Sequence, residues 1–274
     1  MDSHKKSPKK IAILCIAASN QPVYVHYIHT YWTSLINFTN AHRPNIDVFL
    51  LFQQGHNIKP YLYLSDNIIV DENKDFNGFF KPEHGHKAVP GILSKTVFAL
   101  EKLKGKYDIF LRTNLSSMIH IGNLEKLAES KDRFIYSGAG IWQNALRKDL
   151  VFRNRVGEDK SIKSLDELAS YPGDTFITGS GYILGPDDVE RIIANKHLLR
   201  YDIVDDVSIG LMIPHHEYIK GFSMKIPTLM QLEDVLDKLK RGRYCHVRLQ
   251  YFPVEKASAL WDQLRSLDHW NFLA

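Results

Sequence analysis

A strand pattern followed by a helix pattern near the start of the chain limits the fold more than any other feature. The apolar run Ile11–Ala18 stops at the turn residues Ser19–Pro22, as is typical of a parallel strand buried on both faces. From Val23–Phe38 apolar residues recur at helical spacing, and Asn40 and Pro44 end that pattern. A strand followed by a helix is the repeating unit of α/β folds.

The alternation continues along the chain. Strands are predicted at Ile46–Phe52, Asn67–Val70, Tyr107–Arg112, Phe134–Tyr136 and Tyr244–Leu249, and strand-like flanks surround a glycine turn within Thr175–Leu184. Helices are predicted at Ile92–Leu103, with Ser94 as a possible cap, and at Leu124–Glu129, Asp187–Ala194 and Leu232–Leu239. Residues 143–173 are predicted to be loop and short helix. The fold class that follows is α/β, with a Rossmann-like, mostly parallel sheet flanked by helices.

Length and charge favour one domain. A chain of 274 residues with 44% hydrophobic content can build a single core, so we expect one domain at residues 10–274. Much of the net charge of +4 comes from lysines in the first ten residues, and residues 1–9 are predicted to be a disordered basic tail. The remainder is close to neutral, so no nucleic-acid partner is expected.

The two cysteines, Cys15 and Cys245, have neither CxxC spacing nor a disulfide framework around them, which favours a reducing compartment. The run Ile11–Ala18 is much shorter than the roughly 20 residues that cross a bilayer. We therefore expect no membrane span and a cytoplasmic location. The sequence leaves the oligomeric state open.

Ligands of open α/β sheets bind beyond the carboxyl ends of the strands. Four segments follow predicted strands there: Ala17–Ser19, Arg112–Ser117, Thr178–Tyr182 and Val204–Gly210. These segments are the candidate binding and catalytic positions.

In this order, the segments resemble the GT-A glycosyltransferases, especially the beta-1,3-galactosyltransferase and Fringe family. Lys95–Thr96 precedes the strand that leads into Arg112–Ser116, and Gly179–Leu184 matches the family's Gly-x-Gly-Tyr-x-Leu segment. Asp205–Gly210 matches its acidic box. The resemblance covers roughly residues 90–215 and implies a GT-A fold, a nucleotide-sugar donor and a glycan acceptor.

One element departs from the family. Its metal-binding Asp-x-Asp is replaced by Asn114-Leu115-Ser116, which offers only neutral oxygens, so no divalent metal cofactor is expected. Positive charge for the leaving diphosphate must then come from side chains. The candidates are Lys95, Arg112, Lys225, His246 and Arg248, among which Arg248 with His246 beside it is favoured because an arginine fork matches phosphate oxygens.

The resemblance assigns the catalytic base to Asp206, with Asp205 as the second choice, and implies inversion at the anomeric carbon. An alternative reading of both acids is that they cap a helix at Val207–Met212.

The other candidates are binding residues. Donor contacts are predicted at Ala17, Ala18, Ser19, Lys95, Arg112, Thr113, Asn114, Ser116, His246 and Arg248. Acceptor contacts are predicted at Trp142, Gly179, Ser180, Gly181 and Tyr182. Core packing is the favoured interpretation of Trp142, and a plain tight turn is an equal alternative for the glycines.

The sequence therefore predicts a metal-independent, inverting glycosyltransferase. Two alternatives stay open: a catalytically inactive GT-A-like protein that binds glycans or partners, and a nucleotidyltransferase on a similar sheet. The acids Asp205 and Asp206 favour transfer over the first, and the missing metal acids argue against the second.

Overall fold

A computed structural model gives the fold. It describes residues 7–73, 90–143, 172–173, 175–177, 181–201, 205–225, 232–241, 244–249, 258–259 and 262. Among these residues, seven strands form the main sheet in the order β10-β6-β9-β4-β1-β2-β3. The bounds of these strands are β1 Ile11–Ile16, β2 Ile46–Gln53, β3 Ile68–Asp71, β4 Ile109–Asn114, β6 Ser137–Gly138, β9 Gly181–Leu184 and β10 Glu217–Tyr218.

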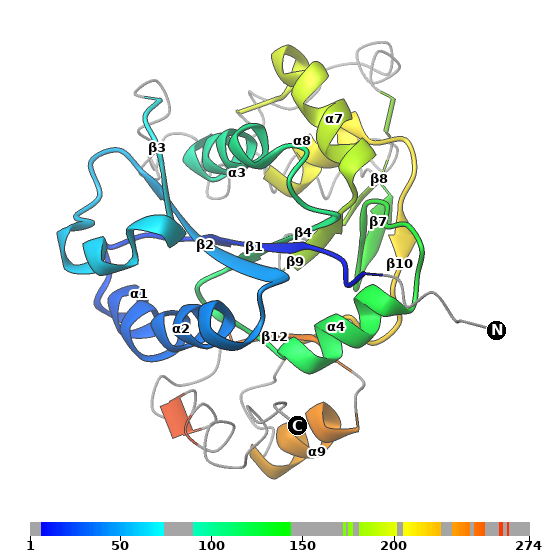
Figure 1. The fold of residues 1–274 in the computed structure, drawn as a ribbon. Coiled ribbons are helices and arrows are strands. Elements are labelled where there is room, and N and C mark those ends of the chain that lie inside the picture. Colours follow the sequence, from blue (N-terminus) through cyan, green and yellow to red (C-terminus); the bar gives the residue numbers. More distant parts are fainter. Residues whose placement is uncertain are drawn as a thin grey trace.

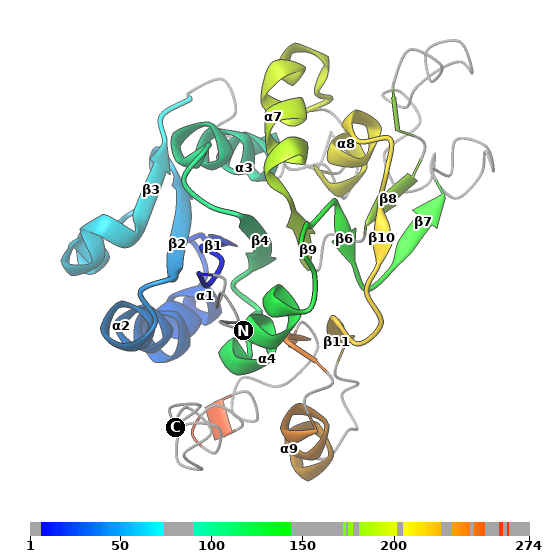
Figure 2. The same cartoon turned by 45° about the vertical axis from the view of Figure 1, so that its right-hand side comes forward.

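The centre of this sheet is parallel. Strand β1 pairs in parallel with β2 and β4, and β2 pairs in parallel with β3. Strand β9 is antiparallel to both of its neighbours, β4 and β6. The sheet is therefore mixed and mostly parallel, which confirms the predicted fold class. Figure 2 shows the strands side by side as a twisted fan.

Helices cover both faces of the sheet (Figure 1). One face carries α3, α7 and α8, and the other carries α1, α2 and α4. The bounds of the helices are α1 Pro22–Tyr27, α2 Thr33–His42, α3 Pro90–Leu103, α4 Ile121–Glu129, α7 Pro186–Ala194, α8 Asp205–Met212 and α9 Leu232–Lys240. A π-helical turn spans Ile28–Trp32, and 3-10 segments span Lys59–Asn67 and Lys196–Leu198.

Two smaller sheets lie beside the main one. Strands β11 (Ser223–Lys225), β12 (His246–Arg248) and β5 (Ser117–Ile119) form the first, and β7 (Ile141–Gln143) pairs with β8 (Thr175–Ile177) in the second. The chain leaves β4 at Asn114 and enters β5 at Ser117. A tight turn at residues 115–116 therefore joins the main sheet to the β11-β12-β5 sheet.

Most predicted elements are confirmed within a few residues, and three details are wrong. The predicted helix Val23–Phe38 is divided into α1, the π-helical turn and α2. Ser94 lies inside α3 rather than at its cap, and its hydroxyl donates to the carboxylate of Asp71. Phe134–Tyr136 is not a strand, and pairing begins only at Ser137.

Phe134 and Tyr136 are buried through side-chain contacts rather than through strand pairing. The ammonium groups of Lys9 and Lys131 lie 5.3 and 5.9 Å from the centre of the Phe134 ring. The Tyr136 hydroxyl accepts from the Ile177 N–H at 3.0 Å. Lys9, which the sequence assigns to the basic tail, also donates to the Ala128 carbonyl at 2.9 Å.

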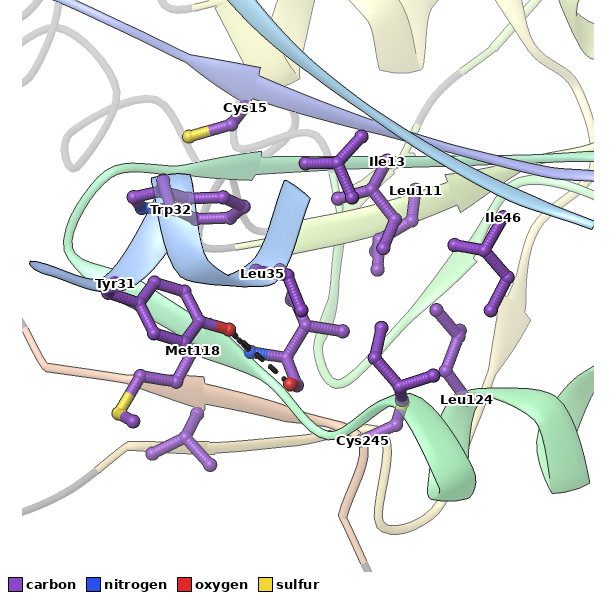
Figure 3. Packing of buried hydrophobic residues seen from close by; sticks show 14 of the residues in the cluster. Ile13, Cys15, Tyr31, Trp32, Leu35, Ile46, Leu111, Met118, Leu124 and Cys245 are labelled. Atoms are coloured by element: carbon purple, nitrogen blue, oxygen red, sulfur yellow. Dashed lines mark hydrogen bonds between the residues drawn. The ribbon is translucent and has the colours of Figure 1, made fainter. Parts of the chain in front are cut away.

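The core has two layers, one on each face of the sheet. In the layer beneath the π-helical turn, Trp32 and Tyr31 pack against residues of β4, β5 and α4 (Figure 3). The Tyr31 hydroxyl accepts from the Ile119 N–H at 2.6 Å and donates to the Ile119 carbonyl at 3.3 Å. One side chain thus ties the helical layer to the small sheet. Across the part of the chain that is described, no helix is long and apolar enough to span a membrane.

We predict that Tyr31→Phe lowers the free energy of unfolding by about 1–3 kcal/mol, because two buried backbone groups of Ile119 lose their partner. The control is Tyr63→Phe, since the Tyr63 side chain is 62% exposed and its hydroxyl contact with Thr33 is open to water. Chemical denaturation measures both variants. Equal midpoints for the two would contradict the role given to Tyr31.

Candidate functional site

Strand β4 presents alternate side chains to opposite faces of the sheet. Arg112 lies in register with Leu14 and Tyr182, which belong to the core layer under α3 and α8. Thr113 lies in register with Gly181 and therefore faces the other layer. The candidate residues of the central strand are thus divided between two environments.

Arg112 and Asp205 form a buried ion pair on the α3 and α8 face. The Arg112 side chain is 2% exposed, and that of Asp205, the first residue of α8, is 12% exposed. The guanidinium carbon lies 5.4 Å from the centre of the Tyr182 ring, which is itself fully buried. The structure therefore brings three predicted site residues together, from β4, β9 and α8.

Lys95 lies on the same face, in α3, and is 5% exposed. Its ammonium donates to the Ala17 carbonyl at 2.8 Å, at the carboxyl end of β1. Burial, and next the positive charge of Arg112, lower the pKa of Lys95 to about 8. This ammonium is still mainly charged at neutral pH, and it has lost much of its contact with water.

The charges of three cations act on Cys15, the next-to-last residue of β1. Burial raises the pKa of the Cys15 thiol, while the charges of Arg112, Lys95 and Arg248 act in the opposite direction. Arg248 comes from β12, whose register places it opposite Ser117 of β5. Lys95, Arg112 and Arg248, which come from three separate elements, are therefore the candidate cations for a ligand bound beyond the end of β1.

Asp206 is the second residue of α8 and is 8% exposed. Its Oδ1 accepts from the Val207 N–H at 2.9 Å, and its backbone carbonyl accepts from the Tyr136 hydroxyl at 3.4 Å. The two acids of the box therefore differ: Asp205 neutralises a buried guanidinium, whereas Asp206 makes a local contact with its own helix.

His246 belongs to the opposite face and is fully buried. Its Nε2 lies 2.9 Å from the Thr113 hydroxyl, its Nδ1 lies 2.7 Å from the Ser223 hydroxyl, and its ring stacks on Phe222. A Cβ at Gly181 would come within 2.7 Å of Nε2, so a glycine is needed for this close approach. In the structure, His246 and Thr113 pack β4 against the small sheet.

The turn that replaces Asp-x-Asp is held by its backbone. The Leu115 carbonyl accepts from the Trp32 indole at 3.0 Å, and the Ser116 carbonyl accepts from the Leu249 N–H at 2.7 Å. Asn114 and Ser116 are half-buried. The two neutral oxygen donors at Asn114 and Ser116 do not fit a divalent cation, which prefers carboxylates. Among the described residues, no three His, Cys, Asp or Glu side chains form a group that could hold a metal.

The remaining predicted residues lie in different places. Ala18 and Ser19 are half-buried at the end of β1. Trp142 belongs to β7, in register with Phe176, and Lys225 belongs to β11, in register with Arg248. Gly179 and Ser180 lie outside the described residues.

Sequence reasoning missed one residue at this edge of the sheet. The Ser19 N–H donates to Nδ1 of His56, which follows β2. The signal was available, because His56 comes after a predicted strand and therefore belongs to the same edge as Ser19.

No protein-family model and no curated protein matches this sequence. Among solved structures, the chain is similar to mouse xyloside xylosyltransferase 1 in its apo form, with 11% identity, a TM-score of 0.46, and 89% of this chain and 98% of the other covered. It is similar to the galactosyltransferase LgtC in complex with donor and acceptor sugar analogs, with 13% identity, a TM-score of 0.47, and 92% and 95% covered.

A third similar structure is a glycosyltransferase involved in the glycosylation of the major capsid of PBCV-1, with 8% identity, a TM-score of 0.44, and 93% and 99% of the two chains covered. At these identities and TM-scores, the likenesses add nothing to the choice of substrate or mechanism.

We predict that Asp205→Ala lowers the free energy of unfolding by about 3–5 kcal/mol, because it leaves the buried Arg112 cation without its counter-ion. Arg112→Met combined with Asp205→Leu should recover most of this loss, since no buried charge then remains. A double-mutant cycle of Arg112→Met and Asp205→Leu, with the free energy of unfolding measured by chemical denaturation, gives the coupling energy between the two side chains. The control is Glu101→Ala, which breaks the exposed pair with Lys196 and should cost less than about 1 kcal/mol.

Proposed function

We propose that this chain is a glycosyltransferase that moves a sugar from a nucleotide-sugar donor to a hydroxyl group of a glycan acceptor, with inversion and without a divalent metal. The observation that carries this proposal is the pair of buried cations near the carboxyl end of β1: Lys95 binds the Ala17 carbonyl there, and Arg112 pairs with Asp205 in the acidic box at the start of α8.

The cations match the charge of a nucleoside diphosphate. A diphosphate that leaves the anomeric carbon gains negative charge in the transition state, and fixed positive charge in a poorly hydrated site stabilises it. Arg112 is paired with Asp205, so we assign the positive charge that meets the diphosphate to Lys95 and Arg248. In this proposal they contact the diphosphate, while Arg112 and Tyr182 support the site from beneath.

The two acids have different roles in this scheme. Asp205 is committed to Arg112, and transfer of a proton to it would remove the counter-ion of a buried cation. Asp206 is the second acid of the box, and it is buried at 8% exposure, with its Oδ1 accepting from the Val207 N–H. We therefore assign the base to Asp206, within the first turn of a helix whose amino end favours negative charge.

The proposed reaction has one displacement step. Asp206 takes the proton of the acceptor hydroxyl, and the acceptor oxygen forms a bond to the anomeric carbon. The bond from this carbon to the diphosphate oxygen breaks, and its electron pair leaves with the diphosphate. Attack from the side opposite the leaving group inverts the anomeric centre.

We predict that nucleoside diphosphates or their sugar conjugates raise the melting temperature, and that the rise persists in EDTA. Binding to the native state alone stabilises by mass action, by about 2.7 kcal/mol at a ligand concentration a hundred times Kd. A thermal-shift panel of nucleotides with and without EDTA and Mg²⁺ or Mn²⁺ measures this. The absence of any shift would rule out the donor site, and a shift abolished by EDTA would rule out metal independence.

We predict that Asp206→Asn reduces the rate of transfer by about 10²–10⁴-fold, since the acceptor hydroxyl loses its base. Nucleotide binding should stay within about twofold of wild type, because Asp206 does not contact the diphosphate in this scheme. The matched control is Asp234→Asn, an exposed acid in the first turn of α9. Release of nucleotide in the presence of acceptor measures the rate, and undiminished turnover by Asp206→Asn would place the base elsewhere.

A further inference from the structure

Two side chains hold the segment that follows β1, and they come from different elements. The Lys95 ammonium of α3 binds the Ala17 carbonyl at 2.8 Å. Two residues later, the Ser19 N–H donates to Nδ1 of His56 at 3.3 Å, and the Ser19 hydroxyl lies 3.4 Å from the same nitrogen. His56 follows β2, which is the parallel neighbour of β1.

The contact with Ser19 fixes the tautomer of His56. A backbone N–H can only donate, so Nδ1 must be the acceptor, and the proton of the neutral ring is then on Nε2. The imidazole also lies against Phe52 of β2, with ring centres 6.1 Å apart. The Nδ1 of His56 therefore holds Ser19 as an acceptor, and the imidazole is itself packed against β2.

We propose that His56 is a positioning residue of the donor site, whose neutral imidazole holds the Ala17–Ser19 segment in the conformation that binds the nucleotide. This inference rests on the proposed function, since it takes the end of β1 as the nucleotide-binding edge. Lys95 orients the Ala17 carbonyl of this segment, and His56 orients the Ser19 N–H.

The surroundings of His56 keep its acceptor available. Burial, and next the positive charge of Lys95, lower the pKa of His56 from its ordinary value. The charge of Lys95 acts on this ring, and with its own pKa of about 8 Lys95 stays mainly protonated below neutral pH. Acid titrates His56 while the charge of Lys95 is unchanged.

The direction of the pH effect follows from these charges. Protonation converts Nδ1 into a donor, which can no longer accept from Ser19. Because the folded protein binds this proton less readily than the unfolded chain, the contribution of His56 to stability is complete above about pH 6.5 and falls as the pH drops below that value. Nucleotide affinity should fall over the same range.

Two substitutions of His56 distinguish the role of the hydrogen-bond acceptor from the role of the titratable imidazole ring. The amide oxygen of Asn is one bond from Cγ, as Nδ1 is, so His56→Asn keeps an acceptor at that position but does not titrate. His56→Gln moves the amide to the ε position. We expect His56→Gln to weaken binding of UDP, used as the probe together with ADP and GDP, by about threefold to tenfold at pH 7, and His56→Asn to bind like wild type.

The pH profile gives a second readout that does not need the Gln variant to fold. Calorimetric titrations from pH 7 to pH 5 should show that wild type loses about threefold to tenfold more affinity than His56→Asn. Protonation of the nucleotide itself is common to both proteins and cancels in their ratio. Melting temperatures without ligand identify any variant that is simply unfolded.

The outcomes distinguish the two proposals. A wild type that binds no nucleotide at any pH overturns the donor site, and the role of His56 with it. A wild type that binds, with His56→Gln binding equally well or with His56→Asn following the same pH profile, overturns only the role of His56.

Discussion

The buried ion pair between Arg112 and Asp205 is the interaction on which the rest of this site depends. It joins the centre of the main sheet to the first residue of α8, and it is nearly closed to water. Removing two charges from water costs several kcal/mol per ion, so the pair persists only if both partners stay in place. The position of α8, and with it that of Asp206, is therefore coupled to a residue of the central strand.

Because side chains alternate along β4, Arg112 and Thr113 make their contacts on opposite faces of the sheet. On one face, Arg112 contacts Tyr182 and Asp205 beneath the candidate site. On the other, Thr113 binds His246, whose second nitrogen is held by Ser223. One of two consecutive residues therefore forms an ion pair on one face of the sheet, and the other forms a packing contact on the opposite face. This explains how the polar segment Arg112–Thr113 can lie in the middle of a sheet.

The sequence predicted what depends on local pattern. The apolar runs identified β1 and β2, and the helical periodicity identified α3, because burial on one or both faces leaves a signature within a single element. It also placed Arg112 and the acidic box among the segments expected at one edge of the sheet. The pairing of Arg112 with Asp205, 93 positions later, was not predictable, since it depends on how α8 packs. The error at Phe134–Tyr136 has the same origin, because side-chain contacts bury these residues without strand pairing.

A side-chain cation differs from a metal ion in how its position is fixed. A metal is held by carboxylates that remain anionic whether or not it is bound, and it can be exchanged or chelated. Arg112 is attached to the chain, so the folding free energy fixes its position, and a carboxylate is needed to stabilise it. That requirement makes the two acids of the box unequal. Asp205 forms the ion pair with Arg112, whereas Asp206 accepts from the Val207 N–H and its negative charge helps to raise the pKa of Arg112.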